Sequence, residues 1–401
     1  MAKTSHLRNL YRKAGFTLFI LFIYVWGSFI PLPFARITSQ FSQLMHTTSH
    51  SMMAFMSGAN FQQLSLFMVG LGPMMIAMIL LQLLMMTRLF GFDTLSVNQM
   101  AMAQQWMTLF FAALQSAFIT IGFHLTANIY QAVAVTIILT AGAMFVTWLG
   151  IMNMKFGIGG TVTLILFNII SGSIGMVRRA VTQIMKLPYA WLWLTGLLLL
   201  SLGLMVFWIA FTKAYYPLYT VDITLSSKNK PVLKPVGLNM GAMMTYMVGM
   251  ALLMMPTMLG AILGPQSIFA NPRFDAALSG VLTFILFYFF SFMQFSPRQQ
   301  AKAFRNSNTY IPNVRPGKPT QRYLSRLMWV ICFPGAVLNT IQLVFGLMGQ
   351  QFLGKFGSIT VIPMNIVMIV MIIGGMRDTL LTLVFPQKYY RLARKERSLE
   401  E

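Results

Sequence analysis

Long apolar stretches alternate with short polar ones along the whole chain. Ten of these stretches approach the roughly 20 apolar residues that a helix needs to cross a bilayer. They lie at 16–33, 71–86, 105–124, 130–149, 158–177, 190–211, 240–260, 277–295, 325–349 and 359–384. The pattern therefore predicts the fold class: an all-α, polytopic membrane protein with ten transmembrane helices.

The predicted helices divide evenly along the chain. Five of them fall in residues 1–189 and five in residues 190–401. Two five-helix halves suit an inverted-repeat membrane architecture, although no clear sequence repeat marks it. A further apolar stretch, 52–59, is too short to span a bilayer. We expect it to be a re-entrant or half-inserted piece before the second helix.

Composition and charge agree with the membrane interpretation. The chain is 57% hydrophobic and only 9% charged, whereas soluble chains carry about 25% charged residues. Its net charge is +22, which in a soluble protein would suggest nucleic acid. Here the bases sit between apolar stretches and no soluble basic domain exists, so nucleic acid is excluded as a partner. Anionic lipid and an acidic protein partner are the better interpretations.

The basic residues also indicate orientation. With the N-terminus inside, 23 of the 29 Lys and Arg fall in inward segments and 6 in outward ones. This asymmetry follows the positive-inside rule and supports the ten-helix count, with both termini cytoplasmic. The basic segment 1–13 precedes an apolar one but lacks the small-residue cleavage pattern of a signal peptide, so we expect a retained first span.

Two inward connections, 212–239 and 296–322, are long enough to form structures of their own, and the chain ends in a basic tail. The first contains Val-Asp-Ile-Thr-Leu at 221–225 followed by a polar, Lys-rich run, which predicts a small hairpin or extended arm. The second carries Pro297, Pro312, Pro316 and Pro319, so it is not one helix.

Residues with catalytic or metal-binding chemistry are scarce. Only Asp378, beside Arg377, lies near the end of a predicted span, where a local ion pair or interfacial anchor is favoured over a proton relay. His46 and His50 have helical spacing but no nearby third ligand, so no metal site is predicted. No hydrolase, metalloprotease or Walker motif is present. With one cysteine, Cys332, no disulfide forms within the chain. The sequence predicts neither an enzyme nor a cofactor.

Several segments, in order and spacing, resemble the SecY family of protein-conducting channels from about residue 10 to 394. They are Gly-Ser-Phe-Ile-Pro-Leu-Pro at 27–33, Met-Ser-Gly at 56–58, Ser-Leu-Phe-Met-Val-Gly-Leu-Gly-Pro at 65–73, Leu-Gln-Leu-Leu at 81–84, Trp-Leu-Gly at 148–150, Gly-Ile-Gly at 157–159, the pair Asn239 and Pro256, and Arg-Pro-Gly at 315–317. The resemblance implies a central pore between two pseudo-symmetric five-helix halves, which passes unfolded polypeptide.

Site residues follow from the resemblance by position. An apolar pore ring is expected at Leu71, Met75, Val162, Leu166, Met247 and Met371. A plug is expected near 52–60, at Met52, Met53, Ala54, Phe55, Met56, Ser57 and Gly58. The lateral gate, where the second and seventh helices part toward lipid, is expected at Ile76, Ile79, Gln115 and Leu252. A motor-binding loop is expected at Arg315, Pro316, Gly317 and Lys318.

The expected pore chemistry makes physical sense. An apolar constriction stops water and ions by dewetting and offers no charge to trap a passing chain. Methionine is abundant, at 35 residues. Most of these residues are interpreted as apolar filling of membrane helices, but at three of the six ring positions an unbranched, polarizable side chain would adapt to varied substrates.

Three departures separate the chain from general secretory members of the family. Gly160 stands where they have Asn, Thr245 where they have Pro, and Gln63 where they have a basic residue. The chain is more similar to the accessory branch of the family in certain Gram-positive bacteria. That branch implies export of Ser-rich glycosylated surface adhesins.

The resemblance also implies partners and a location. The partners are a SecA-type motor ATPase, a small SecE-type membrane subunit, accessory Sec proteins and the secretory preprotein, and the location is the plasma membrane of a bacterium. Two alternatives stay open: the housekeeping SecY of general secretion, and a secondary small-solute transporter. A transporter would need polar binding groups at midplane; Asn168 and Asn365 are candidates, but carboxylates are missing there.

Overall fold

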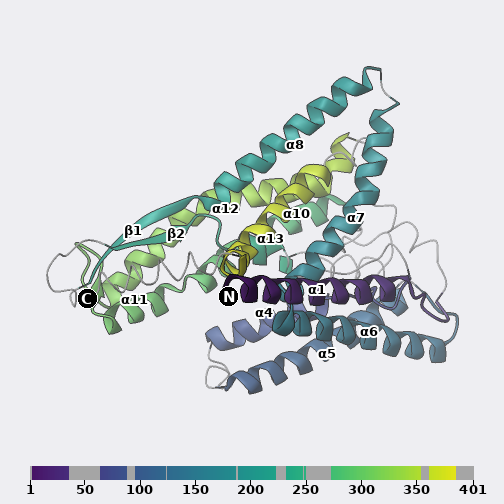
Figure 1. Cartoon of the computed structure of the whole chain (residues 1–401), viewed down its shortest axis with the longest axis horizontal. Helices are drawn as coiled ribbons and strands as arrows, with labels where there is room; N and C mark the ends of the chain where they lie inside the picture. Colours follow the sequence, from purple (N-terminus) through teal and green to yellow (C-terminus); the bar gives the residue numbers. More distant parts are fainter. Residues whose placement is uncertain are drawn as a thin grey trace. The chain divides into compact units, whose positions relative to one another are not determined.

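The computed structural model describes residues 2–35, 64–87, 95–122, 124–186, 188–222, 232–246, 248–249, 272–353 and 361–384. Helices dominate these residues (Figure 1). They are α1 (Ala2–Phe29), α4 (Gly72–Thr87), α5 (Val97–Gly122), α6 (Ile129–Phe156), α7 (Gly160–Ile184), α8 (Ala190–Lys213), α10 (Pro272–Gln294), α11 (Pro297–Asn306), α12 (Lys318–Leu353) and α13 (Val361–Val384). The strands are β1 (Tyr215–Asp222), β2 (Val232–Gly237) and β3 (Thr309–Tyr310).

The helices coincide with the predicted spans. A described helix lies over each span except 240–260, most of which falls outside the described residues. Among the described residues, six helices are long and apolar enough to cross a membrane. Helices α1 and α12 are among those that begin earlier than their apolar stretches, at Ala2 and Lys318. Their first turns are polar and basic. Helical hydrogen bonding includes these turns, although the apolar pattern begins only after them.

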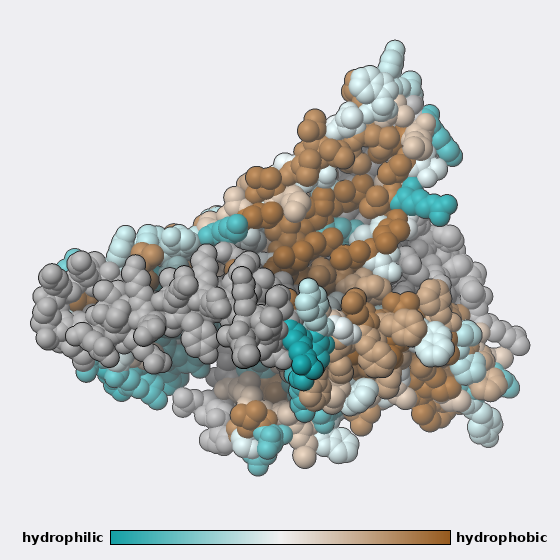
Figure 2. Space-filling model, viewed as in Figure 1, coloured by the Kyte–Doolittle hydropathy of each residue, from teal (hydrophilic) through white to brown (hydrophobic). Residues whose placement is uncertain are grey.

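Large apolar side chains on the helix surfaces indicate a lipid environment. Trp208 is the buried residue of α8, whereas Trp193, Leu199 and Val206 of the same helix are each more than half exposed. Figure 2 shows hydrophobic surface over the part of this face where α8 lies in Figure 1. Extended apolar surface of this kind is rare on soluble monomers. The chain is a multi-pass membrane protein.

The chain forms two compact units. Unit 1 comprises residues 1–198, 246–279 and 344–365, and unit 2 comprises 199–245, 280–343 and 366–401. Unit 1 holds α1 and α4 to α7, which pack largely as sequential neighbours: α4 on α5, α5 on α6 and α6 on α7, with α1 against α6 and α7. The division into halves at residue 190 stays a prediction.

The segment that precedes α4, 64–71, anchors the core of unit 1. The backbone N–H of Leu32 donates to Leu64 O at 2.9 Å and that of Leu66 to Ile30 O at 3.1 Å. These bonds tie the end of α1 to the segment that carries Met68 and Val69, both fully buried. Gly142 of α6 lets this backbone approach, because a Cβ there would overlap the carbonyl oxygen of Leu66.

A buried amide joins α1, α6 and α7 in the same unit. Asn153 is 0% exposed, and its Nδ2 donates to Ile158 O at 3.1 Å and Gly160 O at 2.9 Å. The Thr17 hydroxyl of α1 donates to Asn153 Oδ1 at 2.9 Å and accepts the backbone N–H of Ile158 at 2.9 Å. The glycine-rich turn between α6 and α7 is therefore held by side chains rather than by apolar packing alone.

We expect Asn153→Ala to destabilise the protein by about 1–3 kcal/mol, because the turn carbonyls and the Thr17 hydroxyl would lose a buried partner. Thermal unfolding of the purified protein in detergent measures this as a lower midpoint. Met154→Ala, at an exposed neighbouring position, is the matched control and should leave the midpoint near that of the wild type. Equal midpoints for Asn153→Ala and the wild type would contradict the role of the amide.

Candidate functional site

The connection between α10 and α12 in unit 2 presents a short basic loop. Ile311 and Thr320 are buried at its two ends, at 5% and 3% exposure, while Arg315, Pro316 and Lys318 between them are exposed. The Thr320 hydroxyl donates to Arg315 O at 2.8 Å, and the N–H of Val314 donates to Ile311 O at 3.1 Å. The exposed tip is thus fixed by hydrogen bonds at both ends.

Backbone chemistry explains why the chain turns here. Gly317 has φ +99°, in the region that favours glycine. Its carbonyl accepts the N–H of Gln321 at 3.1 Å, so it starts α12. Pro319 occupies the first turn of that helix, where a missing N–H costs nothing. The sequence prediction that residues 296–322 are not one helix is confirmed, because α11, β3 and this loop precede α12.

The elements that precede this loop in the sequence include a small three-stranded sheet and α11. β1 pairs antiparallel with β2 over Tyr215–Thr220 and with β3 at Val221 and Asp222, giving the order β2-β1-β3. The hairpin prediction is confirmed, but β1 begins earlier than the predicted 221–225. The Nζ of Lys234 on β2 lies 4.4 Å from the ring centroid of Phe304, which α11 buries. This cation–π contact ties the hairpin to the helix.

The solvent side of these elements is strongly basic. α11 buries Pro297, Ala301 and Phe304 on one face, and its cationic side chains are exposed. With the loop and the start of α12, the exposed cations are Lys234, Arg298, Lys302, Arg305, Arg315, Lys318 and Arg322. We call this set the basic surface. A face of this kind attracts acidic protein surfaces and steers their association.

The predicted pore residues are apolar and mostly buried where the structure describes them. Leu71 and Met75, at the start of α4, are 1% and 4% exposed, and Val162 and Leu166 of α7 are half-buried. All four belong to unit 1. Met371 of α13, in unit 2, is 4% exposed. Met247 lies outside the described residues. The ring itself stays a prediction.

The predicted gate is described in part. Ile76 and Ile79 lie buried on α4, which packs along α5, the helix that carries Gln115. The Gln115 side chain is 6% exposed, and its Oε1 has no hydrogen-bond partner among the described residues. Leu252 and the plug positions Met52, Met53, Ala54, Phe55, Met56, Ser57 and Gly58 lie outside the described residues.

Sequence reasoning missed a chain of side-chain amides in unit 2. Asn339, 0% exposed in α12, donates from Nδ2 to Asn239 Oδ1 at 2.8 Å, and Asn239 Nδ2 lies 3.6 Å from the sulfur of Met371. One signal was available: an Asn in the apolar stretch of α12 requires partners, because buried amides are hydrogen-bonded. The identity of those partners, 100 residues away for Asn239, was not readable from spacing.

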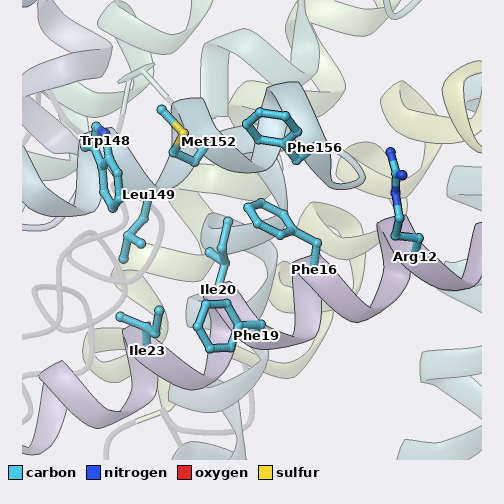
Figure 3. Close-up of a pocket in the computed structure, with 9 residues that line it drawn as sticks. All are labelled: Arg12, Phe16, Phe19, Ile20, Ile23, Trp148, Leu149, Met152 and Phe156. Carbon is cyan, nitrogen blue, oxygen red and sulfur yellow. The ribbon is translucent and has the colours of Figure 1, made fainter.

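A groove of about 690 Å³ is lined by side chains of α1 and α6 in unit 1 (Figure 3). Arg12 lies at one end, and the remaining lining side chains are Phe16, Phe19, Ile20, Ile23, Trp148, Leu149, Met152 and Phe156. None of these nine residues is a nucleophile, a carboxylate or a histidine. The groove suits an apolar occupant and offers no acid–base or metal chemistry.

Comparison with known proteins identifies the family. A family model described as SecY matches residues 65–375. The chain belongs to the SecY family. The accessory Sec system protein translocase subunit SecY2 of Lactobacillus johnsonii is 45% identical over 388 residues, covering 97% of this chain and 98% of that protein. The SecY2 subunit of Streptococcus salivarius is 30% identical, covering 83% and 85%.

A solved structure agrees on the fold. The structure described as "The structure of a protein conducting channel" matches with a TM-score of 0.62 and 16% identity, covering 94% of this chain and 93% of that one. The ten-helix prediction is consistent with this SecY fold. The resemblance drawn from the sequence, including its accessory branch, is confirmed. Membership of this family also leaves the secondary-transporter alternative without support.

In this SecY-family chain, Thr320→Val should loosen the tip of the basic loop, because Arg315 O would lose its buried hydroxyl partner. Hydrogen exchange followed by mass spectrometry should show faster exchange at residues 314–318, by roughly fivefold to tenfold for one net hydrogen bond. Thr320→Ser keeps the hydroxyl and is the control. Unchanged exchange in Thr320→Val would show that the bond does not order the tip.

Proposed function

We propose that this chain is the channel-forming subunit of a preprotein translocase, and that it serves the accessory Sec route that exports Ser-rich glycosylated surface adhesins. The observation that carries the proposal is its kinship, over nearly its whole length, with accessory Sec translocase subunits. The substrate class rests on the sequence resemblance alone. Housekeeping secretion is the alternative that the same fold would also permit.

The pore would be lined by the apolar ring at Leu71, Met75, Val162, Leu166, Met247 and Met371. The burial of Leu71, Met75 and Met371 supports this assignment, since a resting constriction must exclude water. Apolar side chains impose no charge barrier on a passing polypeptide, and methionine adapts to side chains of different shape. The plug at 52–58 and the gate at Ile76, Ile79, Gln115 and Leu252 remain part of this proposal.

The basic surface would be the docking site of a SecA-type motor ATPase. Its support is the exposed tip at Arg315, Pro316, Gly317 and Lys318, ordered at both ends. An ordered tip loses little conformational freedom on binding. The planar guanidinium of Arg315 suits a carboxylate on the motor, with which it can form two parallel hydrogen bonds.

The membrane setting completes the proposal. The excess of Lys and Arg on the loops assigned to the inside favours cytoplasmic termini in a bacterial plasma membrane. The exposed apolar side chains of α8 are suited to contact lipid tails or a small SecE-type membrane subunit. Accessory Sec proteins, the preprotein and anionic lipid are the remaining proposed partners.

A photocrosslinking experiment tests the pore. A photoreactive residue at Met75 should crosslink to a secretory chain arrested midway, whereas the same residue at Leu198, which is 59% exposed on α8, should not. The reason is that the proposed pore ring surrounds a chain in transit, whereas Leu198 lies on a surface suited to lipid. The arrested chain must be detected in the same membranes. Its presence without a crosslink at Met75 would refute the pore assignment.

Charge reversal tests the motor-docking site. Arg315→Glu should reduce export by about tenfold or more, because it places a like charge opposite the proposed carboxylate. Protein abundance in the membrane should stay normal, since Arg315 is exposed. Arg178→Glu, at an exposed position on α7, is the matched control, and pulse-chase export of a secretory substrate is the readout. Normal export by Arg315→Glu would remove this residue from the proposed site.

A further inference from the structure

The amide chain of unit 2 links three separate segments. The Asn339 Nδ2 group donates to Gly335 O at 2.6 Å within α12 and to Asn239 Oδ1 at 2.8 Å. Asn239 then donates toward the sulfur of Met371 on α13 at 3.6 Å. Both protons of the Asn339 amide are thereby used. Asn239 acts as the bridge, accepting from one helix and donating to another.

The backbone around Asn239 is held closely against α12. A Cβ at Gly335 would lie 2.7 Å from Leu238 O and 2.6 Å from the Phe287 ring, so only glycine allows this approach. The Leu238 N–H donates to Ala214 O at 3.1 Å, at the end of α8. A helical turn starts just after, where Thr245 N–H donates to Gly241 O at 2.9 Å. The position of the Asn239 side chain is therefore fixed by its surroundings.

The contact with Met371 differs from the others in kind. A thioether sulfur is a weak acceptor, so this bond contributes little to stability. Methionine, however, has three rotatable side-chain bonds and fills space in many conformations. A directed contact from a fixed amide selects one of them. The chain Asn339–Asn239–Met371 thus specifies where a flexible apolar side chain lies.

We propose that Asn239 and Asn339 are positioning residues that hold the Met371 thioether in the closed apolar constriction. This inference rests on the proposed function, because it takes Met371 as part of the pore ring. Loss of the amide chain frees Met371 to leave the constriction, so the resting channel passes ions. The same loss lowers the threshold for opening, so a preprotein with a weakened signal sequence is exported.

The test measures resting ion conductance of the purified translocase in planar bilayers. Asn239→Leu and Met371→Leu each break the Asn239–Met371 contact. The first replaces the amide by an apolar side chain of similar size, and the second replaces one apolar side chain by another. Each should raise resting conductance by about twofold, the low end of the change expected when one net hydrogen bond no longer favours the closed state, because a thioether is a weak acceptor. The double variant should not exceed Asn239→Leu, because that variant already removes the contact that Met371→Leu breaks.

The control is Asn153→Ala, which removes a buried amide from unit 1. It should lower stability without raising conductance. A leak caused by general destabilisation would appear in this control as well, and would be recognised in that way. Export of a substrate with a defective signal sequence is the second readout and should appear in Asn239→Leu, Asn339→Leu and Met371→Leu but not in Asn153→Ala. A merely structural role would reduce export in these variants and would not extend it to defective substrates.

The outcomes separate this inference from the proposed function. Wild-type conductance in folded Asn239→Leu or Met371→Leu overturns the positioning role, even where Met75 crosslinks to an arrested chain. If Asn239→Leu fails to reach the membrane, Met371→Leu decides alone, because it keeps the core filled. Absence of the Met75 crosslink, with the arrested chain present, refutes the pore and with it this inference.

Discussion

The structure depends on the requirement that a polar group in a membrane interior finds its partner inside the protein. Backbone groups meet this requirement by forming helices. Two buried side-chain amides, those of Asn153 and Asn339, meet it by binding other segments, and so they join helices to distant parts of the chain. Asn153 connects α1, α6 and α7, and Asn339 connects α12 to the segment around Asn239. Apolar packing brings these helices together, but it is the amides that specify register.

The two proposed functional regions of the chain differ in their physical character. The proposed pore residues are apolar, and so leave a passing polypeptide no charged group to bind; Leu71, Met75 and Met371 are also buried. The basic surface is exposed and carries many cations on an ordered frame of sheet, helix and loop. A translocase needs both, because the motor must bind firmly while the substrate must not. Their separation in the chain lets each be tuned without altering the other.

Much of the fold was predictable because the bilayer sets the length of each span. The apolar stretches gave the helices, and four prolines in 296–322 showed that this connection is not one helix. The early start of β1 was missed because Tyr-Tyr-Pro-Leu-Tyr at 215–219 directly follows the apolar α8 and gives no separate signal. The amide contacts were beyond reach because they join residues 100 or more apart. Of the site, the loop geometry is now described, whereas the ring, gate and plug remain predictions.

The end of the hairpin lies next to the amide chain in the sequence. β2 ends at Gly237, and only Leu238 separates it from Asn239. Leu238 is itself bonded to Ala214 at the base of β1. A single residue, Leu238, therefore connects the hairpin, which carries Lys234 of the basic surface, to Asn239 of the amide chain. A displacement of the hairpin would therefore move Asn239 directly, because no loop lies between them.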